Sequence, residues 1–233
     1  TEGELLGVAS KLEMPMLGAE FSRRLETQFP LYQAKLEKAW PSAGTYLSIA
    51  PDRTLTLNLG GRKDLVDLSP LLGMPLTTLT IGGSRVSNLT PLKGMPLTSL
   101  NLQGAPVSNL APLNGMPLTS LNLQGTPISD LAPLNGMSLT WLNLQDSPVS
   151  DLSPLRNMPL TWLHLQNTRV RDLTPLKGMP LTSLTLTGTT ISDLKPLTGM
   201  PLSSLDLAGL QVSDLTPLKG MPLTRLSIED TRV

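Results

Sequence analysis

The residues best suited to chemistry in this chain are two tryptophans, Trp141 and Trp162, which are 21 residues apart. Each is followed two residues later by Asn143 or His164, and four residues later by a glutamine. Large amphipathic rings among hydrogen-bonding groups are typical of noncovalent recognition. The pattern therefore predicts a partner-binding surface, which we assign to Trp141, Trp162, Asn143, His164, Gln145, Gln166, Asn122 and Gln124.

Parts of this surface also have a purely structural interpretation. Identical amides on neighbouring strands can stack on one another, so the glutamines at equivalent positions could serve the fold alone. His164 could be a pH-sensitive contact, or it could be ordinary variation between repeats. Single exposed aromatic side chains are common on proteins, whereas paired rings on a face of small residues are not. The tryptophan pair is therefore the centre of the prediction.

Catalysis finds little support in the residue types. The chain has one histidine and no cysteine, and its serines recur with the repeat rather than beside a base. We expect no enzymatic activity and no cofactor. A row of aspartates offers one carboxylate per repeat, whereas calcium takes six to eight oxygen ligands. We expect no metal site, and we predict that these side chains cap the turns that follow them: Asp130, Asp151, Asp172, Asp193 and Asp214.

A repeat of 21 residues positions all of these side chains. The anchor Gly-Met-Pro-Leu begins at Gly73 and recurs, with small changes, as far as Gly220. Counted from Leu76, apolar residues occupy positions 1, 4, 6, 11, 14 and 17 of each repeat. The alternation around positions 4 and 6 predicts a short strand at positions 3 to 5. Because so short a unit cannot bury its apolar face alone, the repeats must stack into a solenoid with a parallel sheet.

The second half of each repeat cannot be a long helix, because proline occupies position 16 throughout and position 21 in nearly every repeat. We predict extended chain or a turn of 3₁₀ helix. Positions 8 and 19 are glycine in most repeats, and the replacements at Asp146, Asn157 and Asn167 are residue types that tolerate a left-handed backbone. This pattern predicts a positive φ at both corners of the repeat.

The pattern L-x-x-L-x-L-x-x-T-x-V-x-x-L-x-P-L resembles the leucine-rich repeat family over about residues 54 to 233. It is similar to the short bacterial repeats of planctomycete kinase-associated and internalin-like proteins. The resemblance implies an α/β solenoid, a right-handed horseshoe with a parallel concave β-sheet and a 3₁₀ or extended convex side, which binds a partner. One departure is that the family's asparagine at position 9 is replaced mostly by serine or threonine, as at Ser84 and Thr126. We expect their hydroxyls to bond backbone groups there.

The N-terminal region differs from the repeats in composition, and it contains five of the seven aromatic residues. Residues 1–50 are predicted to form a helical cap and the start of a hairpin, and 51–233 a solenoid of about nine repeats, the last incomplete. One helical stretch precedes Pro30, and a second runs from Leu31 to Trp40. A hairpin is predicted around Pro51 and Asp52. The unit from 54 to 75 is one residue longer than the others.

Composition limits the partners. Eighteen basic residues balance eighteen acidic ones, so no charge attracts nucleic acid, and no apolar run is long enough to insert into a membrane. The open sheet edge at Leu226 and Ile228 indicates a missing C-terminal cap, with a monomer expected and dimerisation through that edge as the alternative. The start at Thr1 indicates a trimmed chain, and the compartment cannot be inferred.

We predict a protein or peptide recognition module; the alternatives are glycan binding, or a scaffold regulating an attached domain such as a kinase.

Overall fold

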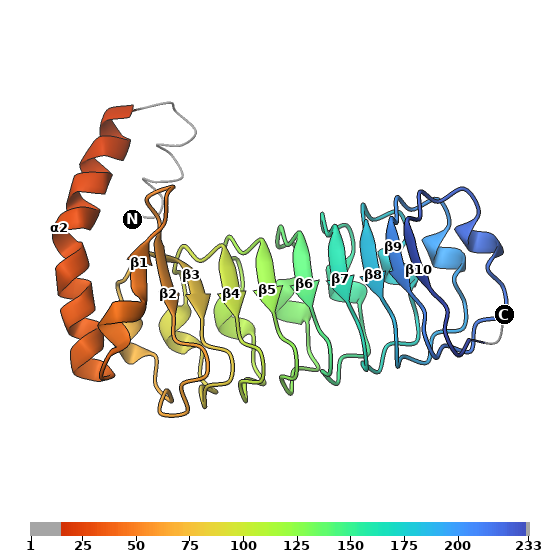
Figure 1. Ribbon diagram of the computed structural model, residues 1–233, viewed down its shortest axis with the longest axis horizontal. Coiled ribbons are helices and arrows are strands. Elements are labelled where there is room, and N and C mark those ends of the chain that lie inside the picture. Colours follow the sequence, from red (N-terminus) through yellow and green to blue (C-terminus); the bar gives the residue numbers. More distant parts are fainter. Residues whose placement is uncertain (1–14, 232–233) are drawn as a thin grey trace.

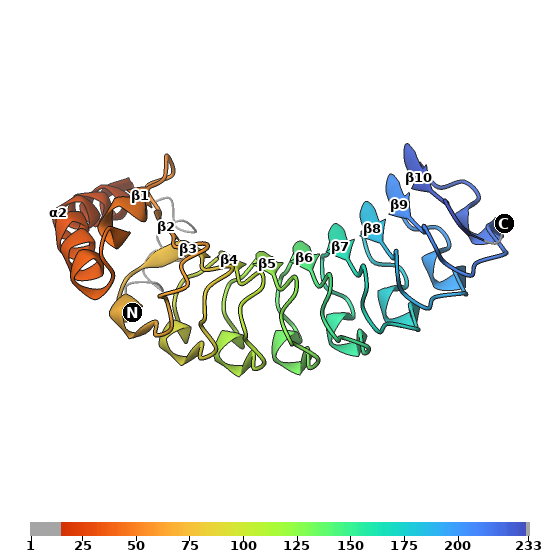
Figure 2. The same cartoon turned by 60° about the horizontal axis from the view of Figure 1, so that its bottom comes forward.

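The computed structural model describes residues 15–231, and it shows one curved solenoid built on a single ten-stranded sheet. The strands follow one another across the sheet in chain order and line the inner curve, while the short helical turns form the outer curve (Figures 1 and 2). The repeat strands are β3 Leu76–Thr80, β4 Ser99–Asn101, β5 Ser120–Asn122, β6 Trp141–Asn143, β7 Trp162–His164, β8 Ser183–Thr185, β9 Ser204–Asp206 and β10 Arg225–Ser227. The horseshoe with a concave parallel sheet is therefore confirmed.

Register across the sheet follows the 21-residue period. Leu100 of β4 pairs with Leu121 of β5, and both side chains are buried; strands β3 to β9 all point this leucine into the core. The residue before each short strand adds a second ladder, because its hydroxyl donates to the equivalent backbone oxygen one repeat earlier, as from Thr140 to Thr119 at 3.2 Å. Backbone and side-chain hydrogen bonds thus connect the same neighbouring repeats.

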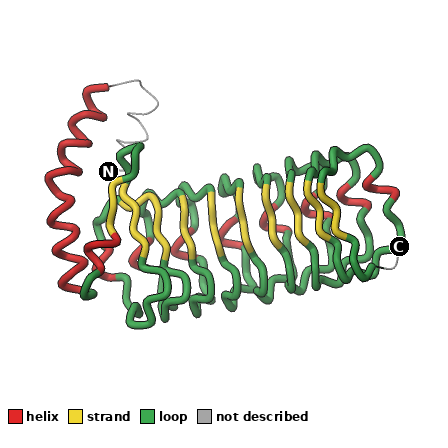
Figure 3. Tube along the Cα trace, viewed as in Figure 1, coloured by secondary structure: helices red, strands yellow, loops and turns green. Residues whose placement is uncertain are grey.

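The outer curve consists of 3₁₀ turns, as the prolines predicted (Figure 3). The five predicted aspartates cap the turns that follow them as expected; for example, Asp151 Oδ1 accepts the Ser153 N–H at 2.8 Å. The corner residues Asp146, Asn157 and Asn167 have φ of 59°, 61° and 56°, which confirms the predicted left-handed backbone. The turns are η2 Ser69–Leu71, η3 Thr90–Leu92, η4 Ala111–Leu113, η5 Ala132–Leu134, η6 Ser153–Leu155, η7 Thr174–Leu176, η8 Lys195–Leu197 and η9 Thr216–Leu218.

Hydroxyls at position 9 replace the expected asparagines inside the solenoid. Thr126 is buried, and its Oγ1 donates to the Leu123 carbonyl at 2.6 Å. Thr168 bonds Leu165 in the same way at 2.7 Å. These bonds stay within one repeat and satisfy backbone carbonyls at the corner after the strand, as predicted.

The N-terminal helix differs from the prediction. A single helix, α2 Pro15–Ala39, runs through Pro30, so the break expected there is wrong. An interior proline removes one backbone hydrogen bond, but Leu25 and Leu36 are both buried and lie 11 residues apart, on one face of the helix. Burying this common face favours a continuous helix despite Pro30, which is exposed. The helical spacing predicted before Pro30 also includes Leu17 and Phe21, whose side chains lie outside those that the structure describes.

The hairpin after the helix is as predicted. A 3₁₀ turn, η1 Ala43–Tyr46, leads into β1 Leu47–Ile49, which pairs antiparallel with β2 Leu55–Asn58. Strand β2 then pairs parallel with β3 through a register shift, with Leu55 opposite Leu76 but Thr56 opposite Thr78. This bulge absorbs the extra residue of the first unit. Within residues 15–231, no helix is long and apolar enough to cross a membrane.

Candidate functional site

The two tryptophans lie side by side on the concave face. Trp141 opens β6 and Trp162 opens the neighbouring β7, and the two residues are paired in register. The leucines that follow them are fully buried, so by the alternation of a strand the indoles and the residues two positions on face the inner curve. Both indoles are half-buried, whereas the leucines that follow them lie in the core. The structure therefore brings the predicted rings together outside the core.

The rings form a stack that the strand spacing imposes. Their centroids are 4.5 Å apart with planes 9° apart, close to the spacing of about 4.8 Å between neighbouring strands. His164 adds a third ring, because its imidazole stacks against Trp162 at 3.5 Å and 25°. Trp162 is thus the shared member of two ring contacts. The three rings form one rigid aromatic surface, which we call the ring stack.

Small residues border the ring stack on both sides. Ser120 of β5 pairs in register with Trp141, and Ser183 of β8 pairs with Trp162. Serine leaves space beside each indole on the sheet surface. The ring stack therefore protrudes from the sheet surface between two rows of small side chains, a shape suited to contact with side chains of a partner.

The electrostatics of the stack depend on His164. Burial against its neighbours lowers the pKa of the imidazole below its usual value, and Asp206, two strands away in the same row, partly opposes this shift. A neutral imidazole has one donor and one acceptor nitrogen. The site at neutral pH is therefore an uncharged aromatic surface with hydrogen-bonding groups at its edge.

The asparagines of the predicted surface have a structural task. Asn143 is only 6% exposed, and its Oδ1 accepts the Gln145 N–H at 2.9 Å. Asn122 makes the same bond to the Gln124 N–H at 3.0 Å. Each bond lies within its own repeat and supports the turn after the strand, so the amide oxygens are committed to the fold rather than to a ladder between repeats.

The glutamines lie at the end of the strands, next to a polar network that sequence reasoning missed. Gln145 Nε2 donates to Asp146 Oδ2 at 3.1 Å, and Asn167 Nδ2 donates to Asp146 Oδ1 at 2.7 Å. A Cβ at Gly188, the equivalent corner of the next repeat, would clash with the Asn167 amide. The departure from glycine at position 8 was the available signal, but it had been explained by backbone conformation alone.

The remaining predicted residues, Gln124 and Gln166, are half-buried in the same column as Gln145. The described residues contain no group of three histidine, cysteine, aspartate or glutamate side chains placed to hold a metal ion. The arrangement provides aromatic and amide surface for binding.

Comparisons with known proteins agree with the fold. The sequence matches no family model and no curated protein. Among solved structures, internalin C2 of Listeria monocytogenes strain 4b F2365 is 29% identical, with a TM-score of 0.71 over 84% of this chain and 83% of that chain. The internalin InlF of the same strain is 24% identical, with a TM-score of 0.68 over 85% of this chain and 68% of that one.

A third structure, the functional domain of InlJ from Listeria monocytogenes, shares the fold at 18% identity and a TM-score of 0.53, covering 75% of this chain and 44% of that chain. That domain includes a cysteine ladder, whereas this chain has no cysteine and connects its repeats through threonine hydroxyls. The 21-residue period, the concave parallel sheet and these similarities together show that the chain has the leucine-rich repeat fold and is similar in structure to the Listeria internalins.

Proposed function

We propose that the chain is a non-catalytic recognition module that binds a protein or peptide on its concave face, centred on the ring stack. The observation that carries this proposal is the stack itself. Four other repeats have serine at this column, at Ser99, Ser120, Ser183 and Ser204, so folding does not require an aromatic residue there. Partly exposed tryptophans on a rigid scaffold are typical of binding hot spots.

Within the proposed site the residues have different roles. The ring stack supplies apolar area and a fixed shape, and Gln145 and Gln166 border it. Asn122 and Asn143 support the turns beside it through their amide oxygens. Because Trp162 already stacks against two rings, its faces are poorly placed to receive a flat sugar ring. Trp141 stacks against one ring and borders Ser120 on its other side, so a glycan is the alternative that the experiment must separate from a protein or peptide.

We further propose that the module acts as a monomer. The last repeat strand, β10, leaves Leu226 and Ile228 about 40% exposed. A few exposed apolar groups on one short strand are a small surface compared with the roughly 800 Å² per partner of a standard interface. The concave face, and not this edge, is therefore the proposed binding surface.

Selection from a displayed random peptide library tests the function. Peptides selected on the wild-type chain are measured against the double variant Trp141→Ser and Trp162→Ser, which copies the neighbouring repeats. We expect at least about a 30-fold loss of affinity, the equivalent of a hot spot of about 2 kcal/mol.

The matched control is Val66→Ser, which removes an exposed apolar group away from the ring stack and also introduces the residue that later repeats have at that column. Its affinity for the same peptides should be unchanged. Equal binding by wild type and the double variant would reject the ring stack as the docking site. Selection of no peptide, with glycans captured instead on an array, would favour the glycan alternative.

A further inference from the structure

One repeat, residues 160–180, carries two arginines where its neighbours have small residues. Arg169 stands at position 10, which is proline in the three preceding repeats. Arg171 stands at position 12, where six other repeats have a serine. Because serine serves the fold in those six repeats, the solenoid does not require an arginine there. The six serines are Ser87, Ser108, Ser129, Ser150, Ser192 and Ser213.

The two arginines leave the same face of an anchored, extended segment. Thr168 and Val170 are buried, whereas Arg169 and Arg171 alternate with them and are exposed. The Arg169 N–H donates to the Val149 carbonyl of the previous repeat at 2.8 Å, which fixes the segment against the solenoid. By the alternation of an extended chain, the two side chains leave the backbone on the same side.

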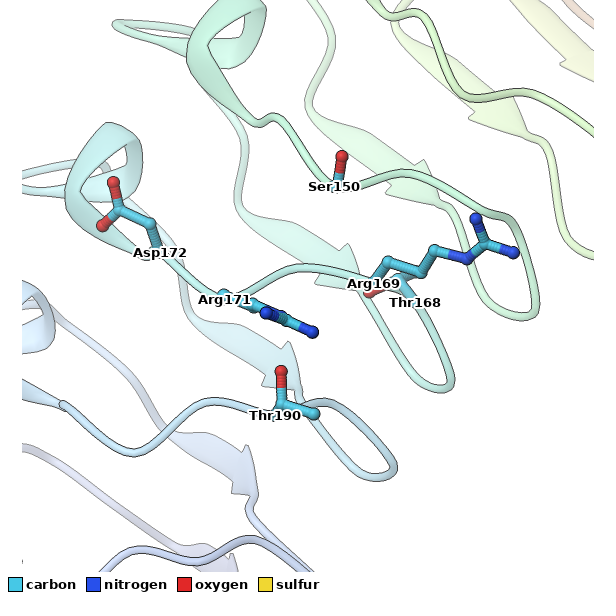
Figure 4. A pocket seen from close by; sticks show the side chains of 6 residues that line it. All are labelled: Ser150, Thr168, Arg169, Arg171, Asp172 and Thr190. Atoms are coloured by element: carbon cyan, nitrogen blue, oxygen red, sulfur yellow. The ribbon is translucent and has the colours of Figure 1, made fainter.

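An open hollow of about 430 Å³ lies beside these side chains, on the flank of the solenoid between the strands and the outer turns. Figure 4 shows Arg169 extending toward the corner loop of the preceding repeat, the loop that leads to Ser150, while Arg171 lies above Thr190 of the next repeat. The two cationic groups therefore lie at separate points of the hollow. We call it the arginine groove; its lining is Ser150, Thr168, Arg169, Arg171, Asp172 and Thr190.

The lining of the arginine groove has more positive than negative charge. The ion pairs found among the described residues, Arg53 with Glu26 and Arg62 with Asp64, lie in the N-terminal part of the chain. Asp172 is the acidic group of the lining, and its Oδ1 accepts the Thr174 N–H at 2.7 Å. The Thr174 hydroxyl and N–H, with a smaller contribution from Arg156, hold the pKa of Asp172 below its usual range. Two guanidinium groups thus face one carboxylate that already caps a turn.

We propose that the arginine groove binds an acidic, extended segment of a protein partner through carboxylates two residues apart. Guanidinium groups prefer carboxylates as planar, two-point partners. Side chains two residues apart on an extended peptide are about 6.6 Å apart on one face, which matches two arginines at i and i+2 on an extended segment. Hydroxyls of Ser150 and Thr190 can complete the hydrogen bonding. This site is on the flank and does not depend on the ring stack.

A titration followed by ¹H–¹⁵N NMR tests the proposal on the whole chain. The probe is the synthetic peptide Ser-Glu-Ser-Glu-Ser-Glu-Ser, compared with the same peptide carrying glutamine in place of glutamate and with inorganic phosphate. We expect the acidic peptide to shift the backbone signals of Ser150, Arg169, Arg171 and Thr190 in a saturable way, with affinity that falls as salt rises.

The variant that removes the site is Arg169→Thr with Arg171→Ser, which copies the following repeat. It should weaken peptide binding by about fivefold or more, as expected for two partly exposed charge pairs. The control Arg85→Thr removes an exposed arginine at the position equivalent to Arg169 in a distant repeat, and it introduces the same residue as the Arg169 change. Its peptide affinity should remain that of wild type.

Three results would overturn the proposal. The first is unchanged peptide affinity in the double arginine variant. The second is equal binding of the glutamine peptide, which would remove charge from the recognition. The third is an equal response to inorganic phosphate at the same concentration, which would reduce the groove to a general anion site. Because the ring stack is intact in every variant, these results leave the proposed concave-face function untouched.

Discussion

Mutual stacking of the two indoles predicts that Trp141 and Trp162 contribute to stability as a coupled pair. Replacing Trp141 with serine removes one ring contact, whereas replacing Trp162 removes two, since Trp162 also stacks on His164. Stacked aromatic pairs contribute about 0.5–1.5 kcal/mol beyond area burial. We therefore expect Trp162→Ser to destabilise the chain by about 1 kcal/mol more than Trp141→Ser.

A double-mutant cycle measured by urea unfolding gives the coupling directly. The two single variants and the double variant should deviate from additivity by about 0.5–1.5 kcal/mol, with the double variant less destabilised than the sum of the single variants. Folding itself should survive, because serine occupies the same column in four other repeats. A second cycle between Trp141 and the distant Val66 provides the control, and it should be additive within about 0.5 kcal/mol. A coupling within that error for Trp141 and Trp162 would refute the stacked arrangement.

Three further predictions concern the histidine, one corner and the sheet edge. The pKa of His164, read from its ring signals by NMR, should lie below 6.5. The contribution of His164 to the free energy of unfolding should then be lost as pH falls below about 6.5, because the unfolded chain binds the proton first. A pKa above 6.5 would contradict burial as the dominant cause. His164→Thr, the residue in the next repeat, should remove this part of the pH dependence of unfolding. Asn157 has φ of 61°, so Asn157→Ala should destabilise the chain by about 1 kcal/mol in urea unfolding while Asn157→Gly is tolerated, and equal midpoints for both would contradict backbone strain as the cause. Sedimentation velocity at micromolar concentration should show a monomer, and a dimer abolished by Leu226→Lys would instead assign an interface to β10.

Much of the fold could be predicted because every repeat has the same residue types at the same positions. The leucine columns, the prolines and the turn aspartates each recur at a fixed position, so one local error would not have changed the architecture. The left-handed corners were predicted even where glycine is absent, at Asp146 and Asn157, because few residue types tolerate that backbone. The extra residue of the first unit was visible in sequence, but its location in a β-bulge beside Leu55 was not.

The errors arose where tertiary contacts decide. Pro30 was expected to end a helix, yet burial of one continuous face on both sides of it sustains α2. In the site, residue type predicted the exposed rings but not what the amides do. Asn143 stays a predicted partner contact, and the structure adds a role that its residue type did not indicate, because its oxygen caps the backbone of its own repeat. The bond between Asn167 and Asp146 connects two consecutive repeats, and a column-by-column reading did not show it.

The most direct test of the central claim uses the indole N–H signals in ¹H–¹⁵N NMR. The chain has three tryptophans. Trp40, which directly follows α2, is buried and serves as an internal control. Single serine variants at Trp141 and Trp162 assign the other two signals. On titration with a library-selected peptide, the signals of Trp141 and Trp162 should shift together to saturation while that of Trp40 stays in place. Saturated binding that moves neither concave indole would contradict docking on the ring stack.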